Sequence, residues 1–326
     1  MNRRDTILAL IALGGIPDVA CAQQSGKTWR VGFLGAFARP ADGLPPAVLR
    51  DCLAEFGYKL GSNLVIESRW AETRFERLPS LAAEIVQSQV DAIVVTGWQP
   101  ALAVKRATTT IPIVVIYVGD AVQSGLATSL RKPGANLTGV SEMEVELSAK
   151  RLQILKETFP KIARMAILWN QDDLGMTLRY NSIEAAASAL GITVQGHGLR
   201  SPEDIEAALA VIKRDRPDAI FVVADTLTSS HRRRLIEFTA EQRIPGMYEF
   251  TAYPQEGGLM SYGPSNEEIY RRVGYFIDRI LRGAKPGDLP MEQPTRYYLT
   301  INMKTAKALG IAIPPIVLLR ADQVIE

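Results

Sequence analysis

The chain has 326 residues, of which 47% are hydrophobic and 22% charged, and its 37 basic and 35 acidic residues give a formal net charge of +2. This length exceeds the usual size of one domain, so we expect two lobes or domains. Because opposite charges nearly cancel and form no long run of one sign, the composition argues against a nucleic-acid-binding protein.

Residues 1–22 have the order of a secretory signal peptide. Arg3 and Arg4 precede an apolar run over residues 7–16, and small residues stand at the predicted cleavage site after Ala22. The apolar run is shorter than the ~20 residues that a membrane-spanning helix needs. We therefore expect export, which in a bacterium with two membranes means the periplasm. The arginine pair leaves both the general secretory and the twin-arginine routes open.

The two cysteines have different expected fates. A lipid anchor at Cys21 is an alternative to the free form, although Asp18 stands where a lipoprotein signal has an apolar residue. If Cys21 leaves with the signal peptide, Cys52 is the one thiol of the mature chain and cannot form an internal disulfide. Cys52 lies among apolar residues at helical spacing, which predicts a buried structural thiol.

Strands and helices alternate through the first half of the chain. Apolar runs predict strands at residues 29–36, 64–70, 91–96 and 113–118, with helical patterns at 47–56, 77–88 and 101–107 between them. Repeated βαβ units imply right-handed crossovers and a parallel sheet. The segment 138–141 is too short for a core strand and predicts a crossing to another lobe.

The same alternation restarts after residue 141. Helical patterns occur at residues 146–158, 180–190, 202–214 and 231–243, and strand patterns at 164–169, 192–196, 218–224 and 246–250. A long helix at 266–282 should return to the first lobe, followed by a strand at 295–301. The predicted fold is therefore α/β, with two Rossmann-like lobes built on parallel sheets.

The lobe boundaries follow from this alternation. We expect residues 28–138 plus 265–293 in the first lobe and 142–263 in the second, with the terminal segment 294–326 packing across both. More than one chain crossing between lobes limits their relative motion to a hinge.

Ligands of open α/β sheets bind beyond the carboxyl ends of the strands, so the residues that follow each strand are the candidate site. These residues are Ala36, Phe37, Trp98, Gln99, Gly119, Asp120, Asn170, Asp225, Tyr248, Glu249 and Tyr262, and Ser141 at the end of the crossing segment joins them. Their aromatic members could form apolar walls and their polar members could fix an organic ligand. For each one, packing in its own lobe or helix capping is the alternative role.

Signals for cofactor or metal chemistry are weak. His197 and His231 are the two histidines, no metal-ligand spacing occurs, and the chain has no phosphate-binding loop. The GFLGAF stretch at 32–37 lacks the glycine spacing of a dinucleotide site. No cofactor and no metal are therefore expected. An exported enzyme using Asp225 and Glu249 as acid and base remains an alternative.

Several stretches together resemble a known family. They are RVGFLG, VIESRWAE, RMAILWN, GGLMSYGP and GAKPGDLPMEQPT, and they are similar to ABC-transporter substrate-binding proteins related to tryptophan- and tyrosine-binding importer proteins. The resemblance covers nearly the whole mature chain. It implies a type I periplasmic binding protein with three interlobe crossovers, without catalytic activity, that closes on an amino acid, an aromatic compound or a carboxylate. A separate permease and ATPase are the implied partners, and a monomer suits the free lobe motion.

The resemblance also implies roles for particular residues. In similar proteins the first lobe holds a ligand carboxylate and an acid of the second lobe meets the ammonium group. Here the loop 119–125 with Ser124 would hold the anion, and Asp225 or Glu249 would meet the ammonium. Because Pro100 lacks an N–H and the helix at Trp98 has no Ser or Thr at its start, the pattern of an amino acid binder is incomplete. A sensory module with the same fold is a further alternative.

Overall fold

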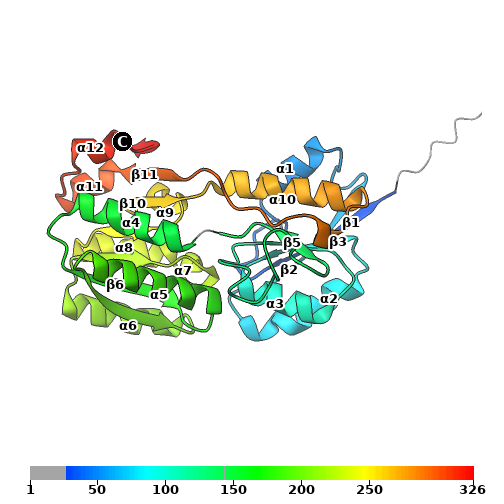
Figure 1. The fold of residues 1–326 in the computed structure, drawn as a ribbon, viewed down its shortest axis with the longest axis horizontal. Coiled ribbons are helices and arrows are strands. Elements are labelled where there is room, and N and C mark those ends of the chain that lie inside the picture. The colour runs from blue at the N-terminus through cyan, green and yellow to red at the C-terminus, as the bar shows by residue number, and fades with distance from the viewer. Residues whose placement is uncertain (1–26, 143) are drawn as a thin grey trace, which may run out of the picture.

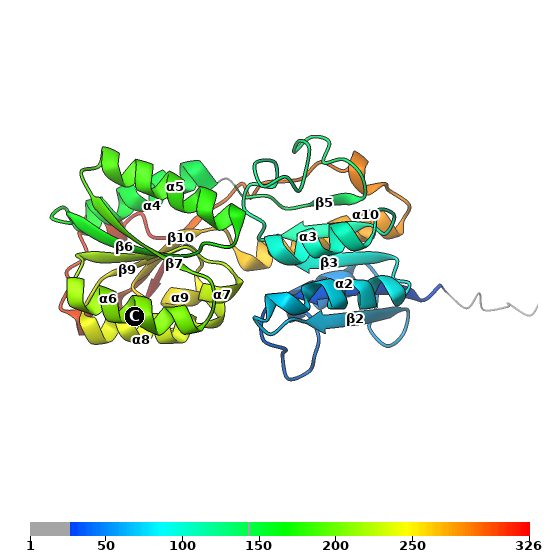
Figure 2. The ribbon, with the colours of Figure 1, turned by 90° about the horizontal axis from the view of Figure 1, so that it is seen from below.

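The computed structural model describes residues 27–142 and 144–326. The predicted signal peptide and Cys21 lie outside the described residues. Two α/β lobes lie side by side along the long axis of the molecule, and each has a central sheet between layers of helices (Figures 1 and 2). Within the described residues, no helix combines the length and the apolar character needed to cross a membrane.

The first lobe contains a five-stranded parallel sheet. Its strands, in the spatial order β2-β1-β3-β4-β5, are β1 (Trp29–Gly35), β2 (Leu64–Trp70), β3 (Ala92–Thr96), β4 (Ile113–Ile116) and β5 (Leu137–Gly139). β5 is a short edge strand, although the sequence suggested only a crossing there. Cys52 is buried in this lobe as a free thiol, as expected.

Helices cover both faces of this sheet. α1 (Ala47–Glu55) and α10 (Asn266–Leu281) pack on one face, and α2 (Leu78–Gln87) and α3 (Trp98–Ala107) pack on the other, with the 3-10 turns Phe75–Arg77 and Pro286–Asp288 beside them. Val94 of β3 joins the first of these cores and Val95 joins the second. A strand buried on both sides explains the continuous apolar runs in the sequence.

The second lobe contains a seven-stranded sheet. Its strands, in the spatial order β12-β11-β10-β9-β8-β6-β7, are β6 (Arg164–Asn170), β7 (Thr193–Leu199), β8 (Ala219–Val222), β9 (Gly246–Tyr248), β10 (Met260–Gly263), β11 (Tyr298–Asn302) and β12 (Gln323–Ile325). All neighbouring pairs are parallel except β10 and β11.

Two helical layers enclose this second sheet. One layer contains α4 (Glu144–Thr158), α5 (Leu174–Ala189), α11 (Met303–Leu309) and α12 (Pro315–Leu318). The opposite layer contains α6 (Glu203–Asp215), α7 (Thr226–Ser230), α8 (Arg232–Gln242) and α9 (Ala252–Gln255).

The terminal segment 294–326 was expected to pack across both lobes, but its strands belong to the second lobe. β11 and β12 extend the sheet of the second lobe, and Leu299 and Ile301 are buried in that lobe's core. Pairing satisfies the backbone groups at the edge of β10, which a segment spanning two lobes would leave unpaired. The helix α10, in contrast, returns to the first lobe and packs against α1 (Figure 1).

Within residues 27–142 and 144–326, three segments connect the lobes: 140–142, 264–265 and 282–297. The first and third run side by side, because the Ser141 N–H donates to the Glu292 carbonyl at 2.8 Å and the Glu292 N–H donates to the Gly139 carbonyl at 3.0 Å. Residues from all three connections line one cavity at this hinge. Three adjacent crossings allow the lobes to rotate about this region while limiting other motions.

Candidate ligand-binding cleft

A cavity of about 350 Å³ lies between the two lobes. Its lining residues are Phe37, Pro46, Val48, Gly97, Tyr117, Asp173, Ala224, Asp225, Thr226, Ser229, Arg232, Phe250, Ala252, Tyr253, Asn266 and Tyr270. The volume lies near the lower end of the range for small-molecule sites, roughly 300–1,000 Å³. The cavity therefore suits a ligand of about amino acid size.

Three aromatic rings from both lobes form one wall of the cavity. Tyr117 makes edge-to-face contacts with Phe250 at 5.5 Å and with Tyr270 at 6.1 Å between ring centroids. The Tyr117 hydroxyl donates to Asn266 Oδ1 at 3.1 Å. Tyr117 has a φ of 56°, in the left-handed region that residues other than glycine rarely adopt. This turn directs its ring away from the path of β4 and toward the second lobe.

Two carboxylates lie at another part of the cavity wall. Asp173 is the N-cap of α5 and accepts from the Met176 N–H at 3.2 Å, while Asp225 is the N-cap of α7 and accepts from the Asn170 side-chain amide at 2.7 Å. Burial, together with the charge of Asp225, raises the pKa of Asp173 to about 7, and burial also raises the pKa of Asp225. Within the described part of the chain, neither carboxylate forms an ion pair.

The lobes are close together in this structure. A Cβ added to Gly97, just before α3, would lie 3.5 Å from Thr226 Oγ1, at the start of α7 in the other lobe. A Cβ added to Gly175 would lie 3.2 Å from the Val118 carbonyl oxygen. The first turns of α3 and α7 thus face each other across the cleft, where N–H groups of helix N-termini attract anions. This arrangement is a closed form.

Among the predicted site residues, Phe37 and Asp225 line the cavity. Ala36 is buried in the first lobe, and the Trp98 indole N–H donates to the Ser124 carbonyl at 3.2 Å, beside the cleft. Gln99 lies in a separate groove between α2 and α3. The first turn of α3 therefore presents its backbone, with Gly97, to the cavity.

The predicted anion loop forms its own internal contacts. The Gly119 carbonyl accepts from the Ser141 hydroxyl at 3.1 Å and from the Glu142 N–H at 3.1 Å. Asp120 accepts from the Val122 and Gln123 N–H groups at 2.9 and 3.0 Å. This loop therefore fastens the first crossing to the first lobe rather than lining the cavity.

The predicted residues of the second lobe also lie mostly outside the cavity. Tyr248 is fully buried, stacks on Tyr253 and hydrogen-bonds Thr239. Tyr262 packs beside Tyr297. Asn170 does not line the cavity, and its side-chain amide donates to Asp225. Asp173, which was not predicted from the sequence, lines the cavity together with Asp225.

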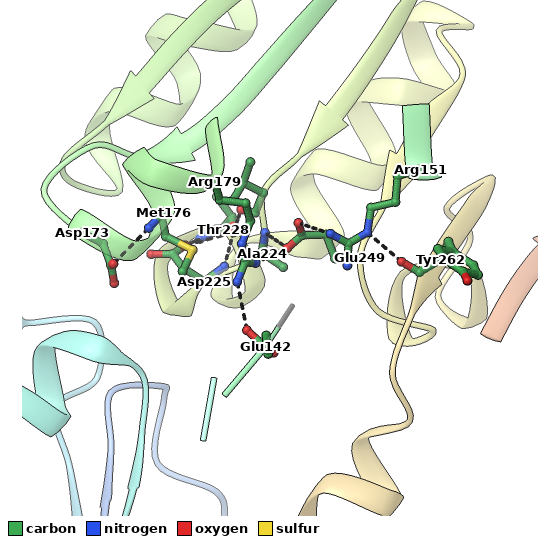
Figure 3. Close-up of polar contacts among 11 residues, drawn as sticks. Glu142, Arg151, Asp173, Met176, Arg179, Ala224, Asp225, Thr228, Glu249 and Tyr262 are labelled. Atoms are coloured by element: carbon green, nitrogen blue, oxygen red, sulfur yellow. Dashed lines mark hydrogen bonds and ion pairs between the residues drawn. The ribbon is translucent and has the colours of Figure 1, made fainter. Parts of the chain in front are cut away.

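Glu249 forms ion pairs with two arginines (Figure 3). Arg151 donates to Glu249 Oε1 at 2.9 Å and Arg179 donates to Oε2 at 2.6 Å, and the glutamate side chain is fully buried. Its charge is therefore already compensated within the second lobe. Glu249 serves neither as an ammonium partner nor as the base of a carboxylate pair with Asp225 in this arrangement.

The remaining aromatic lining residues could not be predicted from their local sequence. The predicted strands 113–118 and 246–250 end early, since β4 stops at Ile116 and β9 at Tyr248. Tyr117 and Phe250 consequently turn into the cleft instead of continuing a strand. Tyr270 lies on α10, far from any strand end, and reaches the cavity because α10 returns to the first lobe.

The described residues include no cluster of His, Cys, Asp or Glu that could hold a metal ion. The model of a family described as ABC transporter substrate binding protein matches residues 44–325. The chain belongs to this family. The resemblance predicted from the sequence is thereby confirmed, together with the two-lobed α/β fold.

Relatives of known structure or name support the same assignment. A tyrosine-binding protein of Clostridioides difficile (strain R20291) is 26% identical over 260 residues, which are 79% of this chain and 74% of that protein. The ABC domain in complex with L-Trp from Streptococcus pneumonia is 26% identical, covers 92% of this chain and 100% of its own, and has a TM-score of 0.85.

A third comparison shows the same fold. The ligand-free, open structure of a substrate binding protein from Clostridium difficile is 24% identical, covers 91% of this chain and 99% of its own, and has a TM-score of 0.64.

Family membership defines the general function. The chain is the substrate-binding component of an ABC importer, an extracytoplasmic protein that binds a small molecule and works with a permease. Members of this family bind and do not catalyse, so the alternative of an exported enzyme is set aside.

Proposed function

We propose that this protein binds an aromatic L-amino acid in the interlobe cavity and delivers it to its permease. The observation that carries the proposal is the pair of buried carboxylates, Asp173 and Asp225, in a cavity whose lining also includes several aromatic rings. Two acids without an ion-pair partner favour a cationic group between them. The tyrosine-binding and L-Trp-bound relatives support the same class of ligand.

The ligand's ammonium group would sit beside Asp173 and Asp225. The carboxylate of Asp225 already accepts from Asn170 and Thr228, which fixes its orientation. Asp173 accepts from the Met176 N–H as the helix cap, and a carboxylate has about four lone-pair sites, so sites remain for the ligand. Ammonium binding would thus complete the hydrogen bonding of both acids and cancel their mutual repulsion.

The aromatic ring and the carboxylate of the ligand would occupy the rest of the cavity. Phe37, Tyr117 and Phe250 offer faces and edges for ring contacts, which are worth about 0.5–1.5 kcal/mol per pair beyond area burial. The ligand carboxylate would approach the N-terminus of α3 at Gly97 and the hydroxyl of Thr226 opposite it. Closure of the lobes brings these groups together, so the closed form binds best.

The transport setting follows from the same proposal. After export the protein would act in the periplasm as a monomer, because each cycle requires free lobe motion and one face for the permease. The ATPase partner would act on the far side of the membrane. Nucleic acid has no part in this cycle.

Titration calorimetry with ligand analogues tests the proposal. We expect L-tyrosine and L-tryptophan to bind, and 3-(4-hydroxyphenyl)propionate, which lacks only the amine of tyrosine, to bind at least about tenfold more weakly. Asp173→Asn and Asp225→Asn should each weaken the binding of both amino acids. Asp172→Asn is the matched control, because Asp172 is exposed and does not line the cavity. Equal binding of tyrosine and its amine-free analogue would refute the ammonium site.

A further inference from the structure

A buried chain of four charged side chains connects the hinge with the wall of the cavity (Figure 3). Glu249 stands at its centre, between Arg151 on α4 and Arg179 on α5. Arg179 reaches on to Glu142 with an Nη2–Oε2 distance of 2.9 Å. All four side chains are at most 4% exposed, and their formal charges sum to zero.

This network contacts both the cavity wall and the second crossing. Glu249 Oε2 also accepts from the Ala224 N–H at 2.8 Å, and Ala224 lines the cavity directly before Asp225. At the other end, Arg151 Nε donates to the Tyr262 carbonyl at 2.7 Å, two residues before the crossing at 264–265. The network therefore forms a rigid part of the second lobe behind the ligand site.

Glu142 differs from the other three members, because its backbone is attached to the first lobe. It lies in the first crossing, and its N–H donates to the carbonyl of Gly119 in the loop after β4. The neighbouring Ser141 hydroxyl donates to the same carbonyl. A Cβ added to Gly119 would lie 3.7 Å from Arg179 Nη2, so the guanidinium packs against the first lobe.

We propose that the ion pair between Glu142 and Arg179 is a latch that forms when the lobes close and that stabilises the ligand-bound form. Glu142 moves with the first lobe and Arg179 with the second, so rotation about the hinge separates their charged groups. Arg179 keeps Glu249 as a partner in the open form, while Glu142 becomes hydrated. Arg179 is thus a positioning residue that ties ligand capture to the hinge, and this role goes beyond the identity of the ligand.

The burial of the pair makes its contribution depend on closure. In the closed form Glu142 Oε1 is buried and has no hydrogen-bond partner among the described residues, so the carboxylate depends on Arg179 for its stabilisation. Removing one partner of a buried charged pair leaves the other uncompensated, which is far more costly than losing an exposed pair. For Glu142 this cost falls on the closed form, because opening would expose its carboxylate to water and leave Arg179 paired with Glu249.

The test uses Glu142→Gln, which keeps the side-chain shape and removes the charge. We expect a larger open fraction in the ligand-free protein, measured as interlobe distances between one spin label on each lobe. We also expect L-tyrosine to bind about 10- to 100-fold more weakly, mainly through faster dissociation. Glu292→Gln is the matched control, since it breaks the half-exposed pair between the third crossing and Arg272 of α10 and leaves the Glu142–Arg179 pair in place.

A second variant separates the latch from a general structural role. Arg179→Met removes the same latch from the other side, so its double variant with Glu142→Gln should be no weaker in binding than Arg179→Met alone. Additive losses would overturn the proposal. So would interlobe distances and dissociation rates for Glu142→Gln that equal those of Glu292→Gln, whatever happens to the melting temperature. The distance measurement uses no ligand, so a failure of tyrosine to bind would refute the proposed function and leave the latch to be judged separately.

Discussion

Acidification from pH 8 to pH 5.5 should weaken amino acid binding through protonation of Asp173. Burial and the neighbouring Asp225 raise the pKa of this carboxyl to about 7 in the closed form. A ligand ammonium favours the ionised carboxylate, so the complex binds fewer protons than the free protein and affinity falls as the pH drops through 7. Below its pKa the ionised fraction falls tenfold per pH unit, so at pH 5.5 the affinity is lower by up to about 30-fold. In the open free protein Asp173 is hydrated, which lowers its pKa toward the ordinary value. The loss of about 30-fold in affinity is therefore an upper bound.

Calorimetric titration of L-tyrosine across this pH range, compared with Asp173→Asn, checks the prediction. The asparagine retains an oxygen for the Met176 N–H, so the start of α5 should remain capped. The variant should bind more weakly at pH 8 and show a shallower pH profile, because Asp225, whose pKa burial also raises, remains at the ammonium site. A flat profile for the unmodified protein, or an unchanged slope in the variant, would refute the assignment of Asp173 to the ammonium site.

Further substitutions test the wall of the cleft, a helix cap and a glycine of the first sheet. Phe250→Ala removes a ring from the cavity wall and should cost about 1–3 kcal/mol of binding free energy by calorimetry, with equal affinity arguing against ring contact. Thr228→Ala breaks the capping box at the start of α7 and should lower the free energy of unfolding by about 1 kcal/mol in denaturant titration; no change would show that the cap is dispensable. Gly139→Ala places a Cβ 2.1 Å from the Val115 carbonyl oxygen, whereas Gly191→Ala, also at a positive φ, meets nothing within 4 Å. The melting temperature should therefore fall much further for Gly139→Ala, and equal falls would contradict the steric argument.

Much of the fold could be predicted from the sequence because its strands are buried on both faces. Residues 92–96 are all buried, and such runs separated by amphipathic helices imply a parallel α/β sheet whatever the ligand. The return of residues 266–281 to the first lobe also followed from the order of elements. The position of β11 did not, because an antiparallel edge strand has no local signal that distinguishes it from a strand spanning two lobes.

The site was harder to predict because its residues are selected by tertiary contacts. Glu249 follows a strand, as a ligand residue would, yet its arginine partners lie 98 and 70 residues away in the chain. Tyr117 enters the cavity through an uncommon backbone conformation that its apolar neighbours do not indicate. Asp173 was the acid most open to prediction, since a helix N-cap after a strand is a recognisable pattern, but Asn170 was the residue predicted at the end of this strand.

A crystal structure of the protein with L-tyrosine bound would show how the interlobe cavity holds its ligand. We expect the amino nitrogen within hydrogen-bond distance of the Asp173 or Asp225 carboxylate, and the ring against Phe250 and Tyr117, in lobes closed as they are here. A ligand whose amine points away from both acids, or that binds outside the interlobe cavity, would contradict this expectation.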